Sequence, residues 1–240
     1  MRLYYTCQNG QKLYYEIHGQ GSPIVFFHGN GLSSQYFKHQ KVLAKNYQLI
    51  MIDSPGQGQS DALEHMVSFA DIAKEIRSLL HHLHLSSYVI VGHSDGANLA
   101  IAYAQLYPDN VAALLLNAGN IQFRGLTYIS RLLISYKVCK LSLLSKIFLT
   151  LKNAYYVAHL MTINQHLKRS PFKQAKPVYV LVGEKDMIKE KHSLKIAKLY
   201  QKSRLIILPK FGHHIATKDP EVFNQFINDL MNELERKNTV

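Results

Sequence analysis

The sequence has 240 residues, a length that suits one α/β domain with a substantial core. It carries 28 Lys and Arg against 16 Asp and Glu, a net charge of +12, and its only cysteines are Cys7 and Cys139. Two cysteines exclude a disulfide framework, and no apolar stretch reaches the length of a membrane span. Residues 1–9 lack the apolar core of a secretion signal, so the sequence predicts a cytoplasmic protein.

Apolar runs alternate with helix-length segments, a pattern typical of a mainly parallel sheet. The first two runs, residues 3–7 and 12–18, flank Asn9 and Gly10, a dipeptide that favours a tight hairpin. Further strand candidates lie at residues 24–27, 48–52, 88–91, 113–116, 178–182 and 205–208, and helix candidates such as 69–83 lie between most of them. The predicted fold class is α/β, with about eight strands flanked by helices and an antiparallel start.

The loop His28-Gly29-Asn30-Gly31 follows the apolar run 24–27. Alone, it is typical of a plain turn. A glycine-containing loop in this place can also direct a backbone N–H at a developing oxyanion, so Asn30 is a candidate donor and His28 and Gly29 are candidate substrate contacts. The glycine pairs here and in residues 56–58 lack the third glycine of a dinucleotide loop, and no organic cofactor or metal is predicted.

The segment Gly92-His93-Ser94-Asp95-Gly96 lies between the apolar run 88–91 and a helix-like run at 97–107. Glycines two positions before and after the serine let the backbone close sharply, which exposes the hydroxyl. The Asp95 N–H at the start of the helix is a second candidate oxyanion donor. The alternative is a turn whose Ser94 only caps the helix.

A serine nucleophile requires a histidine base and an acid that orients it. After Asp109 the next acids are Glu184 and Asp186, and Asp186 follows the apolar run 178–182 and Gly183. Catalytic groups collect at this edge of open α/β sheets, which favours Asp186 as the acid over a turn-capping role.

Two adjacent histidines follow the last strand candidate, 205–208. Either ring can swing over the edge of the sheet. His213 is the predicted base rather than His214, because Gly212 leaves room for its ring to approach Ser94.

These segments together resemble motifs of the α/β-hydrolase superfamily over nearly the whole chain. The similar segments are the oxyanion loop 28–31, the D-x-x-G-x-G-x-S loop 53–60, the serine elbow 92–96, the acid segment 182–186, and Gly212-His213 with Pro220 seven residues after the histidine. The resemblance implies a catalytic triad of Ser94, Asp186 and His213. Asp95 departs from the small or amide residue that is frequent after the nucleophile.

Residues 119–176 interrupt the alternation and read as helices, because apolar residues recur at helical spacing from Ile129 to Tyr136 and from Leu144 to Leu151. The resemblance implies a cap over Ser94, inserted into a core of residues 1–118 and 177–240. The alternative is a helix pair that only covers the sheet edge.

Positive charge is concentrated in this insertion, since ten Lys or Arg and no acid lie between Asn110 and Gly183. Solvated helix faces are the ordinary explanation. A basic lid with apolar faces is also compatible with anionic substrates or peripheral contact with an anionic membrane. No nucleic-acid module accompanies the charge, so no nucleic-acid partner is predicted.

The predicted function is a serine hydrolase that cleaves a carboxylic ester of a small or medium-sized substrate through an acyl-enzyme. Alternatives are an aminopeptidase or amino-acyl ester hydrolase, a thioesterase, a hydrolase of carbon–carbon bonds, and a hydrolase-like binding protein without turnover. The Asp95 side chain allows three readings: it binds a substrate ammonium, it caps the following helix, or it turns toward solvent.

Overall fold

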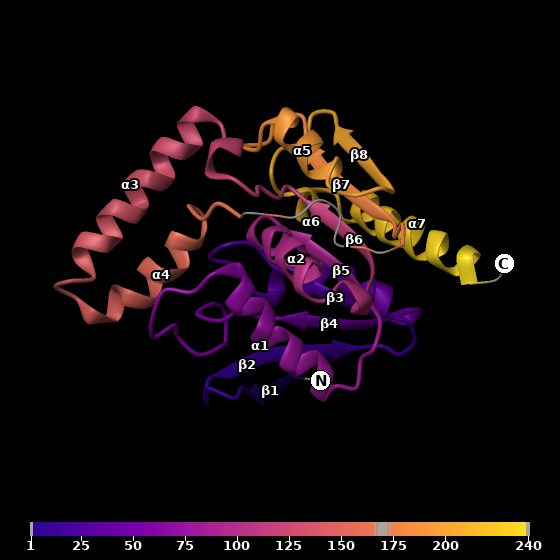
Figure 1. Ribbon diagram of the computed structural model, residues 1–240, viewed down its shortest axis with the longest axis horizontal. Coiled ribbons are helices and arrows are strands. Elements are labelled where there is room, and N and C mark those ends of the chain that lie inside the picture. The colour runs from indigo at the N-terminus through magenta and orange to yellow at the C-terminus, as the bar shows by residue number, and fades with distance from the viewer. Residues whose placement is uncertain (1, 166, 168–171, 173, 239–240) are drawn as a thin grey trace.

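The computed structural model describes residues 2–165, 167, 172 and 174–238, and an eight-stranded sheet forms its centre (Figure 1). The strands are β1 (Arg2–Thr6), β2 (Lys12–His18), β3 (Pro23–Phe27), β4 (Gln48–Ile52), β5 (Tyr88–His93), β6 (Val111–Asn117), β7 (Val178–Gly183) and β8 (Ser203–Leu208). Their spatial order is β1-β2-β4-β3-β5-β6-β7-β8. β2 pairs antiparallel with β1 and β4, and the remaining pairs are parallel. The predicted fold class and the hairpin are confirmed.

Helices cover both faces of the sheet. They are η1 (Ser34–Lys45), α1 (Phe69–His82), α2 (Asp95–Leu106), α3 (Tyr128–Leu144), α4 (Lys152–Leu160), α5 (Glu190–Ala197), α6 (Ile215–Lys218) and α7 (Pro220–Asn238), with short 3₁₀ turns η2 (Pro108–Asn110), η3 (Phe123–Gly125) and η4 (Leu149–Leu151). Val25 and Phe27 pack with α1, α2 and α5, whereas Ile24 and Phe26 pack with η1, α6 and α7. Because successive side chains of a strand enter opposite buried layers, both the odd and the even positions of the strand must be apolar. This explains the continuous apolar runs in the sequence.

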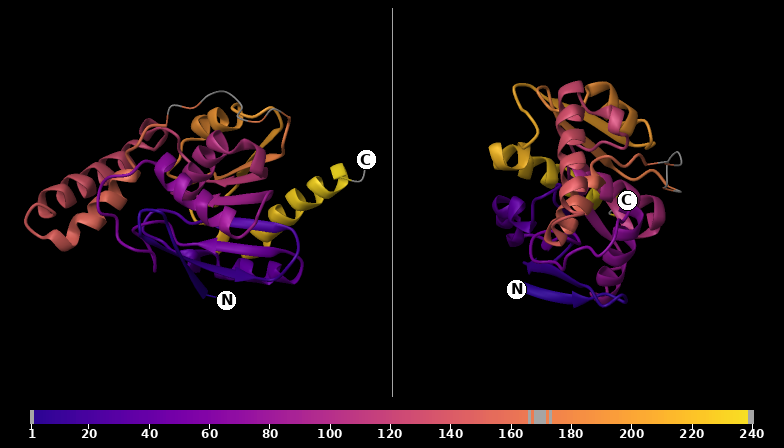
Figure 2. Two further views of the ribbon diagram at one scale, coloured as in Figure 1. Left: turned by 60° about the horizontal axis from the view of Figure 1, so that its bottom comes forward. Right: turned by 90° about the vertical axis from the view of Figure 1, so that its left-hand side faces the viewer.

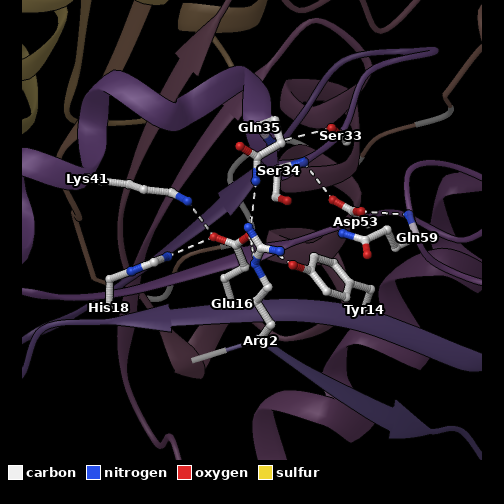
Figure 3. A network of polar contacts seen from close by, with 10 residues as sticks. All are labelled: Arg2, Tyr14, Glu16, His18, Ser33, Ser34, Gln35, Lys41, Asp53 and Gln59. Atoms are coloured by element: carbon white, nitrogen blue, oxygen red, sulfur yellow. Dashed lines mark hydrogen bonds and ion pairs between the residues drawn. The ribbon is translucent and has the colours of Figure 1, made fainter.

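Glu16 joins the β1–β2 edge to η1 through a buried carboxylate (Figure 3). It accepts hydrogen bonds from Lys41 Nζ at 2.6 Å, Tyr14 Oη at 2.9 Å and Gln35 Nε2 at 3.0 Å, and it lies 2.7 Å from His18 Nε2. Burial alone raises the pKa of Glu16, but the hydrogen bonds from Lys41, His18 and Tyr14 outweigh burial and lower the pKa to about 2. The ionised carboxylate therefore stabilises this edge.

The helices α3 and α4 form an arm, residues 128–160, that projects from one end of the sheet (Figures 1 and 2). No residue of α3 is buried, whereas Val157, Ala158 and Leu160 of α4 are. The arm is thus attached mainly through α4. Its helices agree with the helical pattern predicted for 119–176, of which residues 166, 168–171 and 173 lie outside the described residues. In the described part of the chain, no helix combines the length and the apolar character needed to cross a bilayer.

Candidate active site

Ser94 lies on the turn between β5 and α2, with φ of +54° and ψ of −119°. The flanking glycines are required by close contacts: a Cβ on Gly92 would lie 2.4 Å from the Gly96 oxygen, and a Cβ on Gly96 would lie 1.9 Å from the Phe27 oxygen. The Ser94 side chain makes no capping hydrogen bond to α2. The capping alternative is therefore not observed, and the hydroxyl is directed elsewhere.

The hydroxyl of Ser94 begins a chain of two hydrogen bonds. Ser94 Oγ lies 2.9 Å from His213 Nε2, and His213 Nδ1 lies 2.8 Å from Asp186 Oδ1. Since a carboxylate only accepts, Nδ1 carries the proton, and Nε2 accepts from the serine O–H. Ser94 follows β5, Asp186 follows β7 and His213 follows β8, so the structure brings the three predicted residues together at the carboxyl edge of the sheet.

The Asp186 carboxylate is fully buried. Its Oδ1 also accepts the Ile188 N–H at 3.0 Å, while Oδ2 has no hydrogen-bond partner among the described residues. Burial, and then the charge of Asp186, raise the pKa of the buried Tyr36 hydroxyl. Glu184, the other candidate acid, instead accepts the backbone N–H of Lys210 at 2.9 Å.

Two further histidines surround His213. The exposed His214 ring lies 5.2 Å from the His213 ring, and within the described chain it makes no hydrogen bond to Ser94 or Asp186. The buried His93 ring stacks on Tyr36 at 4.4 Å. Burial first, and then His213, lower the His93 pKa well below its usual range. His93 is therefore neutral and packs behind the serine turn.

His28 braces the loop before Asn30. Its Nε2 accepts the Ser54 N–H at 2.9 Å, so the proton lies on Nδ1, which donates to the Gly29 oxygen at 2.8 Å. The ring is buried, and burial lowers the pKa of His28. Both ring nitrogens are occupied by backbone groups, which leaves neither for the substrate contact that was predicted. Gly29 lies against Ser94, since a Cβ on Gly29 would be 3.1 Å from Ser94 Cβ.

The two predicted oxyanion donors, Asn30 and Asp95, directly follow Gly29 and Ser94 in the sequence. In the described part of the chain, neither the Asn30 N–H nor the Asp95 N–H donates a hydrogen bond. The next N–H of the loop, on Gly31, donates to Gln57 Oε1 at 2.6 Å and ties the loop to residues 53–60. The loop is thus held in place while the two N–H groups remain available.

The Asp95 side chain is buried, which differs from the cap and solvent orientations. Its Oδ2 accepts from Asn30 Nδ2 at 2.9 Å and its Oδ1 from Asn98 Nδ2 at 3.1 Å. Burial raises the pKa of Asp95 to about 6, although these amide donors oppose the shift. Both oxygens are already engaged with protein amides, which weighs against the ammonium interpretation.

Asn30 also connects the site to the arm, because its Nδ2 donates to the Val157 carbonyl of α4 at 2.7 Å. Asn153 of α4 makes a second connection: it donates to the Gly56 oxygen at 2.8 Å and accepts the Leu63 N–H at 2.9 Å. Between the arm and these loops lies a cleft of about 310 Å³, whose lining includes Asn30, Asn153 and Lys137 of α3.

Sequence reasoning missed three side chains of this region. Asn98 follows Asp95 by three residues on α2, a spacing that places both on one helix face and could have revealed the pair. Asn120, whose N–H donates to Asn98 Oδ1 at 2.6 Å, follows the carboxyl end of β6, which was also a readable signal. Tyr36 lies in η1, and no motif in the sequence indicates its stacking on His93.

Comparison with known families fits this geometry. A family model described as the alpha/beta hydrolase fold matches residues 22–129. An esterase from Exiguobacterium antarcticum has a similar fold, with a TM-score of 0.81 at 20% identity, covering 98% of this chain and 100% of that one. The chain has the α/β-hydrolase fold.

Two relatives are similar to part of the chain. A protein of Acinetobacter baylyi named (E)-2-((N-methylformamido)methylene)succinate hydrolase is 30% identical over 104 residues, 43% of this chain. A proline iminopeptidase of Arabidopsis thaliana is 32% identical over 110 residues, also 43% of this chain. The matched segments span 40% and 29% of the lengths of these two relatives.

Proposed function

We propose that the protein is a serine hydrolase that cleaves a carboxylic ester through an acyl-enzyme. The observation that carries the proposal is the continuous hydrogen-bonded chain from Ser94 Oγ through His213 to Asp186. A serine hydroxyl is a weak nucleophile near neutral pH, and this arrangement supplies the base and the acid that it requires.

In the proposed reaction, Ser94 Oγ attacks the ester carbonyl while His213 Nε2 accepts the hydroxyl proton. The carbonyl π electrons move to oxygen, and the backbone N–H groups of Asn30 and Asp95 hold the resulting oxyanion. The oxyanion collapses, the bond to the alkoxide breaks, and His213 returns the proton to the leaving alcohol. Water then repeats the sequence on the acyl-enzyme, releasing a carboxylic acid and restoring Ser94. Asp186 stabilises the transient imidazolium.

We propose that residues 119–176 act as the cap, with the α3–α4 arm over the cleft that reaches Asn30. Lys137 contributes a cation to this cleft, which favours a substrate with a carboxylate near the scissile bond. The name of the Acinetobacter baylyi relative, a hydrolase of a substituted succinate, is consistent with that chemistry. An ester that carries a free carboxylate should therefore have a higher kcat/KM than the same ester with that carboxylate replaced by a carboxamide. Lys137→Gln should remove the difference.

The other candidates receive less support from the site. An aminopeptidase or amino-acyl ester hydrolase needs an anion for the substrate ammonium, and both oxygens of Asp95 are engaged by Asn30 and Asn98. No contact in the site favours a thioester or a carbon–carbon bond over an ester. A binding protein without turnover would not require Ser94, His213 and Asp186 in hydrogen-bonding order.

Labelling with a fluorophosphonate probe, followed by peptide mass spectrometry, tests the proposal. We expect one label, on Ser94, and none on Ser94→Ala. A series of p-nitrophenyl esters of increasing acyl length then measures turnover and the size of the acyl pocket. Absence of labelling together with absence of ester turnover would support the binding-protein alternative.

A further inference from the structure

The outer side of α3 carries apolar side chains that nothing in the described structure covers. Ile129, Leu132, Leu133, Tyr136 and Leu143, here called the outer face, are between 53% and 69% exposed. Their spacing of three, four and seven residues places them on one side of the helix. A monomer seldom exposes so many contiguous large apolar groups without a binding role.

The apolar strip continues past the end of α3. Ile147, Phe148 and Leu149, at the turn into α4, are 73%, 55% and 67% exposed. The helix alone extends about 26 Å for its 17 residues. The views in Figures 1 and 2 agree that the arm projects beyond the body of the molecule, so a flat partner can approach it.

Charge selects among the partners that could cover this strip. Lys140, Lys146 and Lys152 are exposed along the arm, and the sequence holds no acid between Asp109 and Glu184. A second copy would bring these like charges together, which opposes self-association. Aromatic and lysine side chains beside aliphatic ones are the composition of segments that lie in a membrane interface.

We propose that the outer face and the turn at residues 147–149 dock on an anionic lipid surface. The apolar side chains enter the boundary between headgroups and acyl chains, while the three lysines contact lipid phosphates. Contact is peripheral. Lys137 lies three residues before Lys140 and lines the cleft instead, so the catalytic cleft and the docking strip use different residues of α3.

The chain provides a reporter for this contact at Cys139 of α3. Cys139 is exposed, whereas Cys7, the other cysteine, is buried. Burial, and then the nearby carboxylate of Glu75, raise the pKa of the Cys7 thiol to about 12. A polarity-sensitive maleimide dye should therefore label Cys139 selectively. We expect its emission to shift to the blue with mixed phosphatidylcholine and phosphatidylglycerol vesicles, but not with phosphatidylcholine alone. Added salt should reverse the shift.

Flotation of unlabelled protein with the same vesicles supplies an independent measurement. Leu132→Ser combined with Tyr136→Ser should lower the partition coefficient at least about tenfold, because both apolar anchors are lost. Lys140→Gln should lower it roughly fivefold. Val42→Ser, an exposed apolar position in η1 outside the arm, is the matched control and should bind like wild type.

Three outcomes would overturn the proposal. They are equal binding to neutral and anionic vesicles, wild-type binding by the Leu132/Tyr136 variant, and a dimer that this variant disperses while no vesicle binding occurs. Circular dichroism checks that the variants are folded. Because flotation requires no turnover, Ser94→Ala can be assayed as well, and a failure of docking is distinguishable from a failure of the hydrolase proposal.

Discussion

The candidate active site at the carboxyl edge of the sheet and the adjacent α3–α4 arm are built in opposite ways. At the edge, the side chains of Asp186, Asp95 and His28 are buried and held by several hydrogen bonds. In the arm, α3 has no buried residue, and hydrogen bonds at Asn153 and the Val157 carbonyl help to fasten α4. The contrast implies that the chemistry depends on a rigid scaffold, whereas the arm can change or move with little effect on global stability.

The largest effect is expected at the edge. Ser94→Ala should lower kcat on the order of 10³-fold or more without unfolding the protein, because it removes the proposed nucleophile. His213→Ala and Asp186→Asn should also lower kcat by several orders of magnitude. Steady-state kinetics with a p-nitrophenyl ester measures each loss.

His214→Ala is the matched control for the base, since His214 is adjacent and exposed. It should keep most of the activity. Loss of activity in His214→Ala with retention in His213→Ala would reverse the assignment of the base.

Substitutions of two leucines, one in the sheet and one in the arm, should show the difference in stability between the two regions. Leu116→Ala, a fully buried position near the carboxyl end of β6, should lower the free energy of unfolding by about 2–5 kcal/mol, because it leaves a cavity. Leu132→Ala in the arm should change it by less than about 0.5 kcal/mol, because the side chain is already solvated. Urea titrations give both values, and equal losses would contradict the contrast between the regions.

Acidic pH should lower the stability of the wild-type protein through Glu16. Its folded pKa of about 2 lies below the ordinary 4.5, so the stabilisation is present above pH 4.5 and is lost as the pH falls toward 2. The shift corresponds to about 3 kcal/mol. Glu16→Gln should remove this dependence, leaving a flatter stability curve below pH 4.5. An unchanged slope in the variant would show that other groups control the acid transition.

Asp95 should change the pH dependence of stability with the opposite sign. Its folded pKa of about 6 lies above the ordinary 3.8, so the folded state binds the proton more tightly. Wild-type stability should therefore fall, relative to Asp95→Asn, as the pH rises from about 4 through about 6. Thermal melts of both proteins over this range measure the difference, and a difference that does not change with pH would show that Asp95 ionises normally.

Much of the fold was predictable because its central strands are buried on both faces. Residues 48–52 match β4 at both ends, and the Asn9-Gly10 turn indicated the β1–β2 hairpin. The positions of Ser94, Asp186 and His213 follow from the rule that parallel strands end at one edge. Short apolar runs and turn residues thus carry enough information to place groups that lie 119 residues apart.

The features that the sequence did not predict are the directions of side chains and contacts between segments that are distant in the sequence. The apolar spacing of α3 predicted helices correctly, but it could not say that Leu132 and Tyr136 face away from the core. The burial of Asp95 depends on Asn30, which lies 65 residues away, and on the fit of a whole loop. Such pairings are decided by packing, which leaves no periodic trace in the sequence.

The backbone of Ser94 has a consequence for how far this fold can be stabilised. A φ of +54° with ψ of −119° belongs to the first central position of a type II′ turn, where glycine is favoured. Ser94→Gly should therefore melt at a higher temperature than Ser94→Ala, by the equivalent of roughly 1–3 kcal/mol, although both lack the hydroxyl. Selection for thermal stability alone would favour glycine at this position. Keeping serine therefore costs stability, which is the expected trade-off when the serine hydroxyl is needed for turnover.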